Sequence, residues 1–274
     1  MSKKIAVVTG AGGGIGREIV TQLNDRGFLV YATDLAIDLM DGLPEAIQKA
    51  VIDVTSADSI QATIDSIVNN EGRIDLLVNN AGFAQLGAVE CVPIELAQKE
   101  FDVNVFGYGR MLQAVLPVMR SQRSGHVINM SSIVGKIAMP GFGWYSASKH
   151  AVEAISDSLR EELRMFNIAV SIIEPGLIAT PFIGKQVESI AGAPHPSEYE
   201  SIAKAPVHAA GNGEKGADPK IIGKAVADAA IAVSPPIRHA LPLDSKSLIV
   251  MRKLVGDRIL GKLMRSAFKI PKRA

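Results

Sequence analysis

The chain of 274 residues has one cysteine, Cys91, so no disulfide can form within it. Its opening stretch, MSKKIAVVTG, has too short an apolar run before the first glycine for a secretory signal. No run approaches the roughly eighteen apolar residues of a membrane span. These absences predict a cytoplasmic protein without a transmembrane segment.

Two other kinds of site are also missing. The five histidines have no cysteine or aspartate cluster at ligand spacing, and no G-x-S-x-G elbow occurs, so the sequence predicts no metal site and no hydrolase. Aromatic residues make up only 5% of the chain and the basic residues are dispersed, which leaves no stacking platform for nucleic acid.

The formal net charge of +1 is a cancellation of two unequal parts. Residues 246–274 hold nine lysines or arginines against one acid, which leaves the other 245 residues at about −7. We interpret the segment as a C-terminal helix with a solvated basic face and a packed side of Leu260, Leu263, Met264 and Phe268. The alternative is a basic helix that contacts anionic lipid at a membrane surface.

Short apolar runs alternate with helical patterns along most of the chain. KIAVVTG, LVYATD, IDLLVNNAG, GHVINMSS and VSIIEPG each end in glycine or a polar residue. Alternation of this kind predicts a single α/β domain with a Rossmann-like, doubly wound parallel sheet covered by helices on both faces. Open sheets of this type bind ligands at the carboxyl edge of the strands, so we expect the site there.

Two long periodic helices are predicted, over residues 96–121 and 145–166. Residues 181–220 are rich in Pro, Gly and Ala, which is typical of a lid over a substrate. The predicted division is therefore a catalytic domain over residues 1–245, including this lid, with residues 246–274 as its basic extension.

The first strand runs into the glycine-rich turn TGAGGGIG before a helix. Glycines let the backbone approach a pyrophosphate, and the helix N-terminus offers free N–H groups to it. The spacing departs from G-x-G-x-x-G and fits T-G-x-x-x-G-x-G. The cofactor-binding residues predicted here are Gly10, Gly14, Ile15 and Gly16.

Asp34 ends the second strand, where dinucleotide-binding folds place an acid for the ribose hydroxyls of adenosine. An acid there repels a 2′-phosphate, and neither Gly13 nor Leu35 supplies a cation to bind one. The sequence therefore predicts NAD in preference to NADP. The structural alternative for Asp34 is a helix cap after the strand.

Residues 4–182 resemble the short-chain dehydrogenase/reductase family. The matching pieces occur in the family's order and are TGAGGGIG, Asp53–Val54, NNAG at 79–82, Asn104, Ser132, YSASK from Tyr145 to Lys149, and PGLIAT at 175–180. The resemblance implies a Rossmann fold, a nicotinamide cofactor and a catalytic set of Asn104, Ser132, Tyr145 and Lys149.

Tyr145 and Lys149 are four residues apart, so on a helix they share one face. The ordinary pKa of a tyrosine is about 10. Lowering it by about three units takes roughly 4 kcal/mol, which a partly buried ammonium and a positively charged nicotinamide could together supply. We therefore expect Tyr145 to be the general acid/base.

The resemblance gives the other residues their predicted roles. Ser132 hydrogen-bonds the substrate oxygen, and strand alternation favours it over its neighbour Ser131. Asn104 holds a water that links the lysine to solvent; otherwise it is a solvent-facing residue of no consequence. The remaining predicted cofactor contacts are Asp53 and Val54 at adenine, Asn80, Ala81 and Gly82 at the adenosine ribose, and Pro175, Gly176, Ile178 and Thr180 at the nicotinamide carboxamide.

Several of these contacts have a structural alternative. Asp53 could cap the end of its strand, residues 80–82 could form a tight turn, and Thr180 could be the N-cap of a helix that starts at Pro181.

The leading hypothesis is an NAD-dependent oxidoreductase that interconverts an alcohol, secondary and lipophilic, with its ketone. The alternatives are an NADPH-dependent 3-oxoacyl-thioester reductase and a non-catalytic NAD-binding or sensing protein. The resemblance also implies a homodimer or homotetramer formed through the two long helices, where Val103, Phe106, Leu112 and Val115 face either a partner or the chain's own sheet.

Overall fold

A parallel sheet forms the centre of the molecule. The computed structural model describes residues 3–181, 195–206 and 216–270. Within these ranges a seven-stranded sheet has the order β3-β2-β1-β4-β5-β6-β7, and every neighbouring pair is parallel. Its strands are β1 (Ile5–Thr9), β2 (Leu29–Asp34), β3 (Gln48–Val51), β4 (Leu76–Asn79), β5 (Gly125–Met130), β6 (Ile168–Pro175) and β7 (Arg238–Leu241). The predicted doubly wound fold is confirmed.

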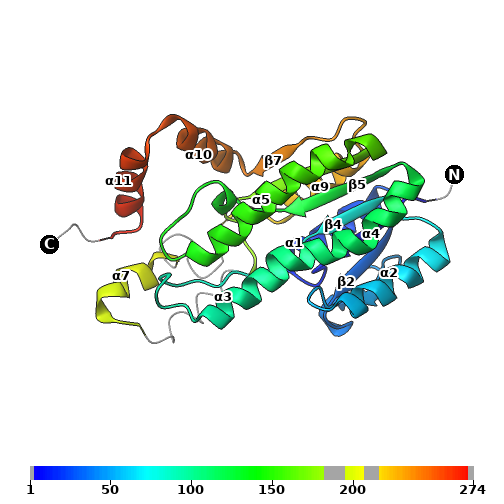
Figure 1. Ribbon diagram of the computed structural model, residues 1–274, viewed down its shortest axis with the longest axis horizontal. Helices are drawn as coiled ribbons and strands as arrows, with labels where there is room; N and C mark the ends of the chain where they lie inside the picture. Colours follow the sequence, from blue (N-terminus) through cyan, green and yellow to red (C-terminus); the bar gives the residue numbers. More distant parts are fainter. Residues whose placement is uncertain (1–2, 182–194, 207–215, 271–274) are drawn as a thin grey trace.

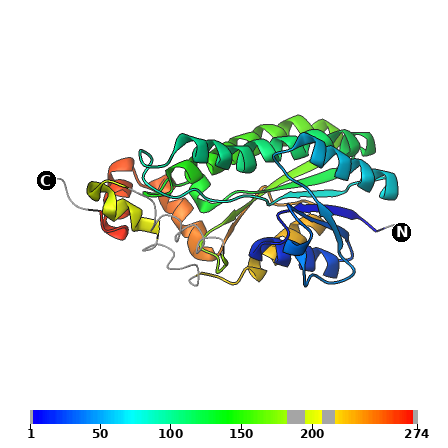
Figure 2. The same ribbon diagram turned by 90° about the horizontal axis from the view of Figure 1, so that it is seen from below.

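Helices cover both faces of this sheet (Figure 1; Figure 2). On one face lie α1 (Gly14–Asp25) and α9 (Lys220–Ile231); on the other lie α2 (Ala57–Glu71), α4 (Tyr108–Gln122) and α5 (Gly143–Leu163). Val7 and Val8 are neighbours on β1, yet each is fully buried in a different core, because successive strand side chains point to opposite faces. This double burial explains the continuous apolar runs in the sequence.

The predicted helix over 96–121 is a composite of three segments. α3 (Ile94–Phe101) is followed by a π-helical turn, η2 (Asp102–Gly107), and then by α4. The helix predicted over 145–166 begins earlier, at Gly143, and its last turn is the 3-10 segment η4 (Arg164–Phe166). Other short 3-10 turns are η1 (Asp38–Met40) and η3 (Ile133–Gly135). The π-helical turn matters for the site, because single turns of this kind often mark functional positions.

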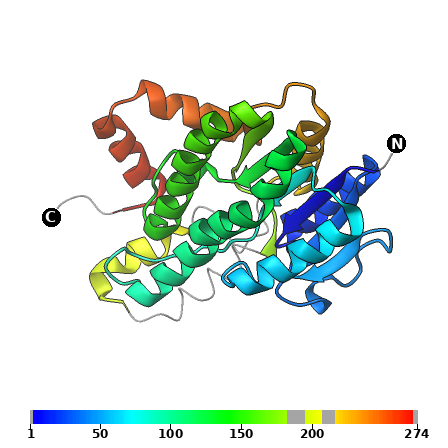
Figure 3. The same ribbon diagram turned by 45° about the vertical axis from the view of Figure 1, so that its right-hand side comes forward.

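The basic extension contains two helices where the sequence predicted one. α10 (Leu243–Leu254) and α11 (Asp257–Ala267) lie at the end of the molecule away from α2 (Figure 3). Leu260 and Phe268 are buried as predicted, but Leu263 is 44% exposed, so its assignment to the packed side was wrong. Val255 and Gly256 separate α10 from α11.

Part of the predicted lid lies outside the described residues, namely 182–194 and 207–215. Between these segments are η5 (Ser197–Tyr199) and α7 (Glu200–Ala203). In the part of the chain that the structure describes, no helix is long and apolar enough to cross a membrane, and no group of His, Cys, Asp or Glu is arranged to hold a metal ion.

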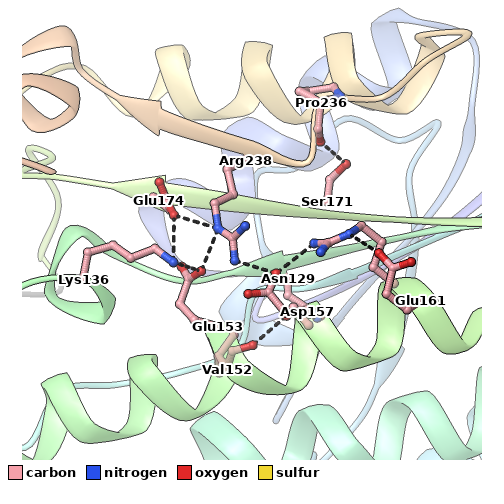
Figure 4. A network of polar contacts seen from close by, with 12 residues as sticks. Asn129, Lys136, Val152, Glu153, Asp157, Glu161, Ser171, Glu174, Pro236 and Arg238 are labelled. Carbon is pink, nitrogen blue, oxygen red and sulfur yellow. Dashed lines mark hydrogen bonds and ion pairs between the residues drawn. The ribbon is translucent and has the colours of Figure 1, made fainter. Parts of the chain in front are cut away.

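A charge network centred on two buried glutamates fastens α5 to β6 and β7 (Figure 4). Glu153 of α5 lies 2.5 Å from Lys136 and 3.1 Å from Arg238, measured from Oε2 to Nζ and Nε. Glu174 of β6 lies 3.6 and 3.5 Å from the same two nitrogens through Oε1. Arg238 reaches Asp157 at 2.6 Å as well. The network therefore fixes α5, the helix that carries Tyr145, against the C-terminal end of β6.

Candidate active site

A cleft of about 950 Å³ runs along the carboxyl edge of the sheet. Every residue predicted as cofactor-binding lines it, and so do three of the four predicted catalytic residues, Ser132, Tyr145 and Lys149. Asn104 is not among the lining residues, because it lies behind the wall. The structure thus brings together positions that are up to 170 residues apart in the sequence.

The glycine-rich turn is packed too tightly for side chains. A Cβ on Gly16 would stand 2.1 Å from the carbonyl oxygen of Gly10, and a Cβ on Gly10 would stand 2.8 Å from the Cα of Ala81. Gly10 also has a φ of +65°, which favours glycine. The turn leads directly into the N-terminus of α1, so a pyrophosphate would find both close backbone and free N–H groups.

The segment after β4 is fastened to this turn. The hydroxyl oxygen of Thr9 accepts hydrogen bonds from the backbone N–H groups of Asn80 and Ala81, both at 3.0 Å. The amide of Asn80 donates to the carbonyls of Thr9 and Gly10 at 2.9 and 3.0 Å. The side chain of Asn80 therefore holds the glycine-rich turn in place while its residue lines the cleft.

Asp34 lies beside the same turn with its carboxylate in the cleft. Its two oxygens accept from the backbone N–H groups of Gly12 and Leu35, both at 2.8 Å. The nearest arginine, Arg17, donates to the carbonyls of Gly12, Leu39 and Asp41. Each nitrogen of this guanidinium donates to a backbone carbonyl, whereas the carboxylate of Asp34 lines the cleft.

The positions predicted for the adenine and nicotinamide sides, Asp53, Val54, Pro175, Gly176, Ile178 and Thr180, all line the cleft. Asp53 and Val54 line the cleft, although one oxygen of Asp53 also accepts from the backbone N–H and hydroxyl of Thr55, as a strand-end cap would. Thr180 is buried against the glycine-rich turn, since a Cβ on Gly14 would lie 2.8 Å from its methyl group. Asp53 therefore forms the strand-end cap considered for it, and its contact with adenine stays a prediction.

Tyr145 lies in the first turn of α5, where it is buried and lines the cleft. Burial raises the pKa of its phenol above the ordinary value, while a hydrogen bond with Ser132 lowers it and the charge of Glu100 raises it. The sequence argument predicted a lowered pKa for Tyr145; in this structure the loss of hydration outweighs the favourable contacts. The Ser132 hydroxyl also donates to the carbonyl of Pro175 at 3.2 Å.

Lys149 shares a helix face with Tyr145, as its spacing predicts. Its Nζ lies 5.8 Å from the centre of the Tyr145 ring and 5.4 Å from that of Tyr108, and it donates to the carbonyl of Met130 at 2.9 Å. Burial lowers the pKa of this ammonium to about 8, and the carboxylates of Glu100 and Glu153 oppose that change. The cation is thus held between two aromatic rings, one helical turn from the phenol.

Asn104 is fully buried in the π-helical turn, so the solvent-facing alternative is wrong. Its Oδ1 accepts from the backbone N–H of Phe83 at 3.0 Å. Its Nδ2 donates to the carbonyl of Phe83 at 2.8 Å and to the hydroxyl of Ser148 at 3.1 Å. The side chain therefore joins the loop after β4 to the helix that carries Lys149.

The sequence did not predict one buried acid beside the site, Glu100. Glu100 precedes Asn104 by four residues, which places both on one face of the helix. A charged residue on the buried face of a periodic helix is the signal that could have revealed it.

The fold and the cleft agree with sequence comparison. A family model described as short chain dehydrogenase matches residues 4–190. This chain belongs to the short-chain dehydrogenase family, whose members are oxidoreductases that use nicotinamide cofactors.

Particular relatives place the chain within that family. It is 33% identical over 238 residues to a 3-ketodihydrosphingosine reductase of Bacteroides thetaiotaomicron. The matched residues make up 87% of this chain and 87% of that one. It is 42% identical over 173 residues to a probable short-chain type dehydrogenase/reductase, VdlC, of Helicobacter pylori, covering 63% of this chain and 64% of that one. It is 34% identical to retinol dehydrogenase 8 of Bos taurus over 70% of this chain and 65% of that one.

A solved structure extends the likeness to the whole chain. A short-chain dehydrogenase from Streptomyces avermitilis superposes with a TM-score of 0.83 at 30% identity, covering 99% of this chain and 100% of that one. The superposition includes the basic extension, so α10 and α11 fall within the part of the fold that the two proteins share.

Proposed function

We propose that this protein is an NAD-dependent oxidoreductase that interconverts a lipophilic secondary alcohol and its ketone. The observation that carries the proposal is the meeting of Ser132, Tyr145 and Lys149 in one cleft whose far end presents Asp34. When bound, NAD supplies the hydride acceptor and a positively charged nicotinamide. The glycine-rich turn has no room for a Cβ at Gly10 or Gly16, so its backbone can approach the pyrophosphate of NAD closely.

Three side chains act on the substrate oxygen in this proposal. Tyr145 takes the proton of the alcohol O–H as hydride leaves the carbinol carbon, and it returns a proton when the ketone is reduced. The hydroxyl of Ser132 donates to the same oxygen and steadies the charge that develops there. Lys149 offsets the negative charge of the phenolate, and Asn104 holds the loop that forms the wall beside it.

The preference for NAD rests on the charges at the adenosine end. Asp34 places a negative carboxylate at the end of β2, and the guanidinium of Arg17 is bound to three backbone carbonyls. A 2′-phosphate would meet repulsion from Asp34 and no available cation among the described residues of this turn.

The lipophilic substrate is inferred from the walls at the chemical end. The apolar side chains that line it are Phe83, Val134, Met139, Phe142 and Leu177. The buried cluster around Tyr145 includes Phe268, which follows α11, and Ala205, which lies two residues after α7. The basic extension and the proposed lid therefore both border the substrate end. Two relatives are named for lipids, a ketosphingoid base and retinol.

The proposed assembly is a homodimer or homotetramer of a protein that functions in the cytoplasm. Leu112 and Val115 are buried in the chain's own core, whereas Phe106 is 57% exposed on the same long helical segment. Phe106, with Ile155 of α5 at 40% exposure, is therefore the side chain we expect at a partner.

The test is an NADH absorbance assay with the purified protein and a panel of alcohols from propan-2-ol to steroids, long-chain 3-hydroxy compounds and retinol. The proposal predicts turnover with NAD, and a kcat/KM at least tenfold higher for bulky alcohols than for small ones. Reduction of a 3-oxoacyl thioester with NADPH alone would contradict it. NAD binding without turnover of any alcohol or ketone would instead favour a non-catalytic NAD-binding protein.

A further inference from the structure

Glu100 is a fully buried carboxylate that the proposed reaction does not use. It lies on α3, and its Oε1 accepts from the backbone N–H of Gln85 at 3.1 Å. Its Oε2 is buried too and has no hydrogen-bond partner among the described residues. A buried carboxylate oxygen is ordinarily paired, so an unpaired one inside the wall of an active site calls for a physical explanation.

The backbone places Glu100 on the same wall as Asn104. The two side chains are one helical turn apart and hold one loop at two points, since Asn104 bonds Phe83 and Glu100 bonds Gln85. Between Asn104 and Lys149 the loop passes through Gly82. A Cβ there would stand 2.9 Å from the Asn104 Oδ1 and 3.7 Å from the Lys149 Nζ. The loop that Glu100 and Asn104 hold therefore passes directly beside Lys149.

The titratable groups that interact with Glu100 come from α5. They are Lys149, whose charge lowers the pKa of Glu100, and Tyr145, whose pKa Glu100 raises. Burial dominates and raises the pKa of Glu100 to about 8. The carboxylate of Glu153 acts on Lys149 as well, but it is also paired with Lys136 and Arg238. Among the described residues Glu100 forms no ion pair, and the groups its charge acts on are Lys149 and Tyr145.

We propose that Glu100 is a positioning residue whose charge sets the pH at which Tyr145 and Lys149 gain or lose their protons. The inference rests on the proposed function, because it concerns the pair that performs the reaction. At low pH Glu100 is neutral and only braces the loop through Gln85. As pH rises it ionises, which stabilises the ammonium of Lys149 and opposes the phenolate of Tyr145.

The first test measures Lys149 without any turnover. Lysine labelled with ¹³C is followed by NMR through a pH titration of the full-length protein, with the Lys149 signal assigned from a Lys149→Met variant. Glu100→Gln keeps the size of the side chain and the acceptor for Gln85 while it removes the charge. The midpoint of Lys149 should fall by roughly 0.5 pH units or more. An unchanged midpoint would overturn the proposal.

The second test measures the pH profile of kcat/KM for alcohol oxidation. Both limbs of the profile should move to lower pH in Glu100→Gln, because neither the phenolate nor the ammonium then has a buried anion beside it. A rate lowered by the same factor at every pH would mean that Glu100 only supports the loop, and would overturn the proposal.

Three variants complete the design. Glu95→Gln removes the same charge from an exposed position of α3 and should move neither readout. Glu100→Asp keeps the charge and should retain the wild-type midpoints, and Glu100→Leu replaces Glu100→Gln if the latter does not fold. If no alcohol is oxidised by the wild type, the proposed function fails, while the NMR titration still decides whether Glu100 controls Lys149.

Discussion

The two ends of the cleft are built in different ways. At the dinucleotide end the protein offers backbone: glycines at Gly10 and Gly16 that leave no space for a Cβ, and N–H groups at the start of α1. At the chemical end it offers buried side chains, and Tyr145, Lys149 and Glu100 all have pKa values displaced by burial. Substitutions at the dinucleotide end should therefore reduce function by steric clash, and substitutions at the chemical end should do so by changing charge.

The largest effect is expected from Tyr145→Phe at the chemical end. The ring stays in its buried cluster and only the titrating oxygen is lost, so kcat should fall by roughly 10²–10⁴-fold. NAD affinity, measured by calorimetry, should stay within a few-fold of wild type. Wild-type rates in this variant would remove Tyr145 from the reaction.

At the dinucleotide end, Gly16→Ala should weaken NAD binding by at least tenfold. Its Cβ would meet the Gly10 carbonyl oxygen at 2.1 Å, so the turn must open. Gly13→Ala is the matched control: its nearest neighbour would be 3.7 Å away and its φ is −77°, which any residue adopts. Equal NAD affinities for the two variants, measured by calorimetry, would show that tight packing of the turn is not what binds the cofactor.

Asp34→Asn separates charge from shape at the same end. The amide oxygen can still accept from the N–H of Gly12, but the repulsion of a 2′-phosphate is gone. The preference for NAD over NADP, measured as a ratio of kcat/KM values, should shrink by about tenfold, or roughly 1.4 kcal/mol. If this ratio does not change, residues other than Asp34 determine the preference between NAD and NADP.

The smallest effect is expected on stability, from the network in Figure 4. Burial and the neighbouring Glu153 raise the pKa of Glu174 from 4.5 to about 7, although the charges of Lys136 and Arg238 act to lower it. A raised pKa in the folded state means stability that is present at low pH and is lost as pH rises toward 7. Thermal melts should therefore show the wild type losing a few degrees relative to Glu174→Gln between pH 4.5 and 7. Parallel Tm curves would contradict this.

The sequence predicts most of the backbone because the fold follows from alternation and glycine spacing. Apolar strands and periodic helices specify the parallel sheet, and Tyr145 and Lys149 share a face because of their spacing. The same reasoning missed the π-helical turn at Asn104, since no propensity distinguishes one extra residue per turn from an ordinary helix.

The electrostatics could not be predicted in the same way. Spacing puts Lys149 near Tyr145, but the direction of the Tyr145 pKa depends on burial by elements far apart in the sequence, including the end of α11. Glu100 was missed for the same reason, because only the packing of α3 against α5 shows which of its neighbours it faces.

The most direct test of the central claim is deuterium transfer. The protein is incubated with NAD and a bulky secondary alcohol that carries deuterium at the carbinol carbon, and the NADH formed is examined by mass spectrometry. Direct hydride transfer in the cleft predicts NADH that carries the deuterium, and no such product with Tyr145→Phe. NADH without deuterium, or equal yields from both proteins, would contradict the account.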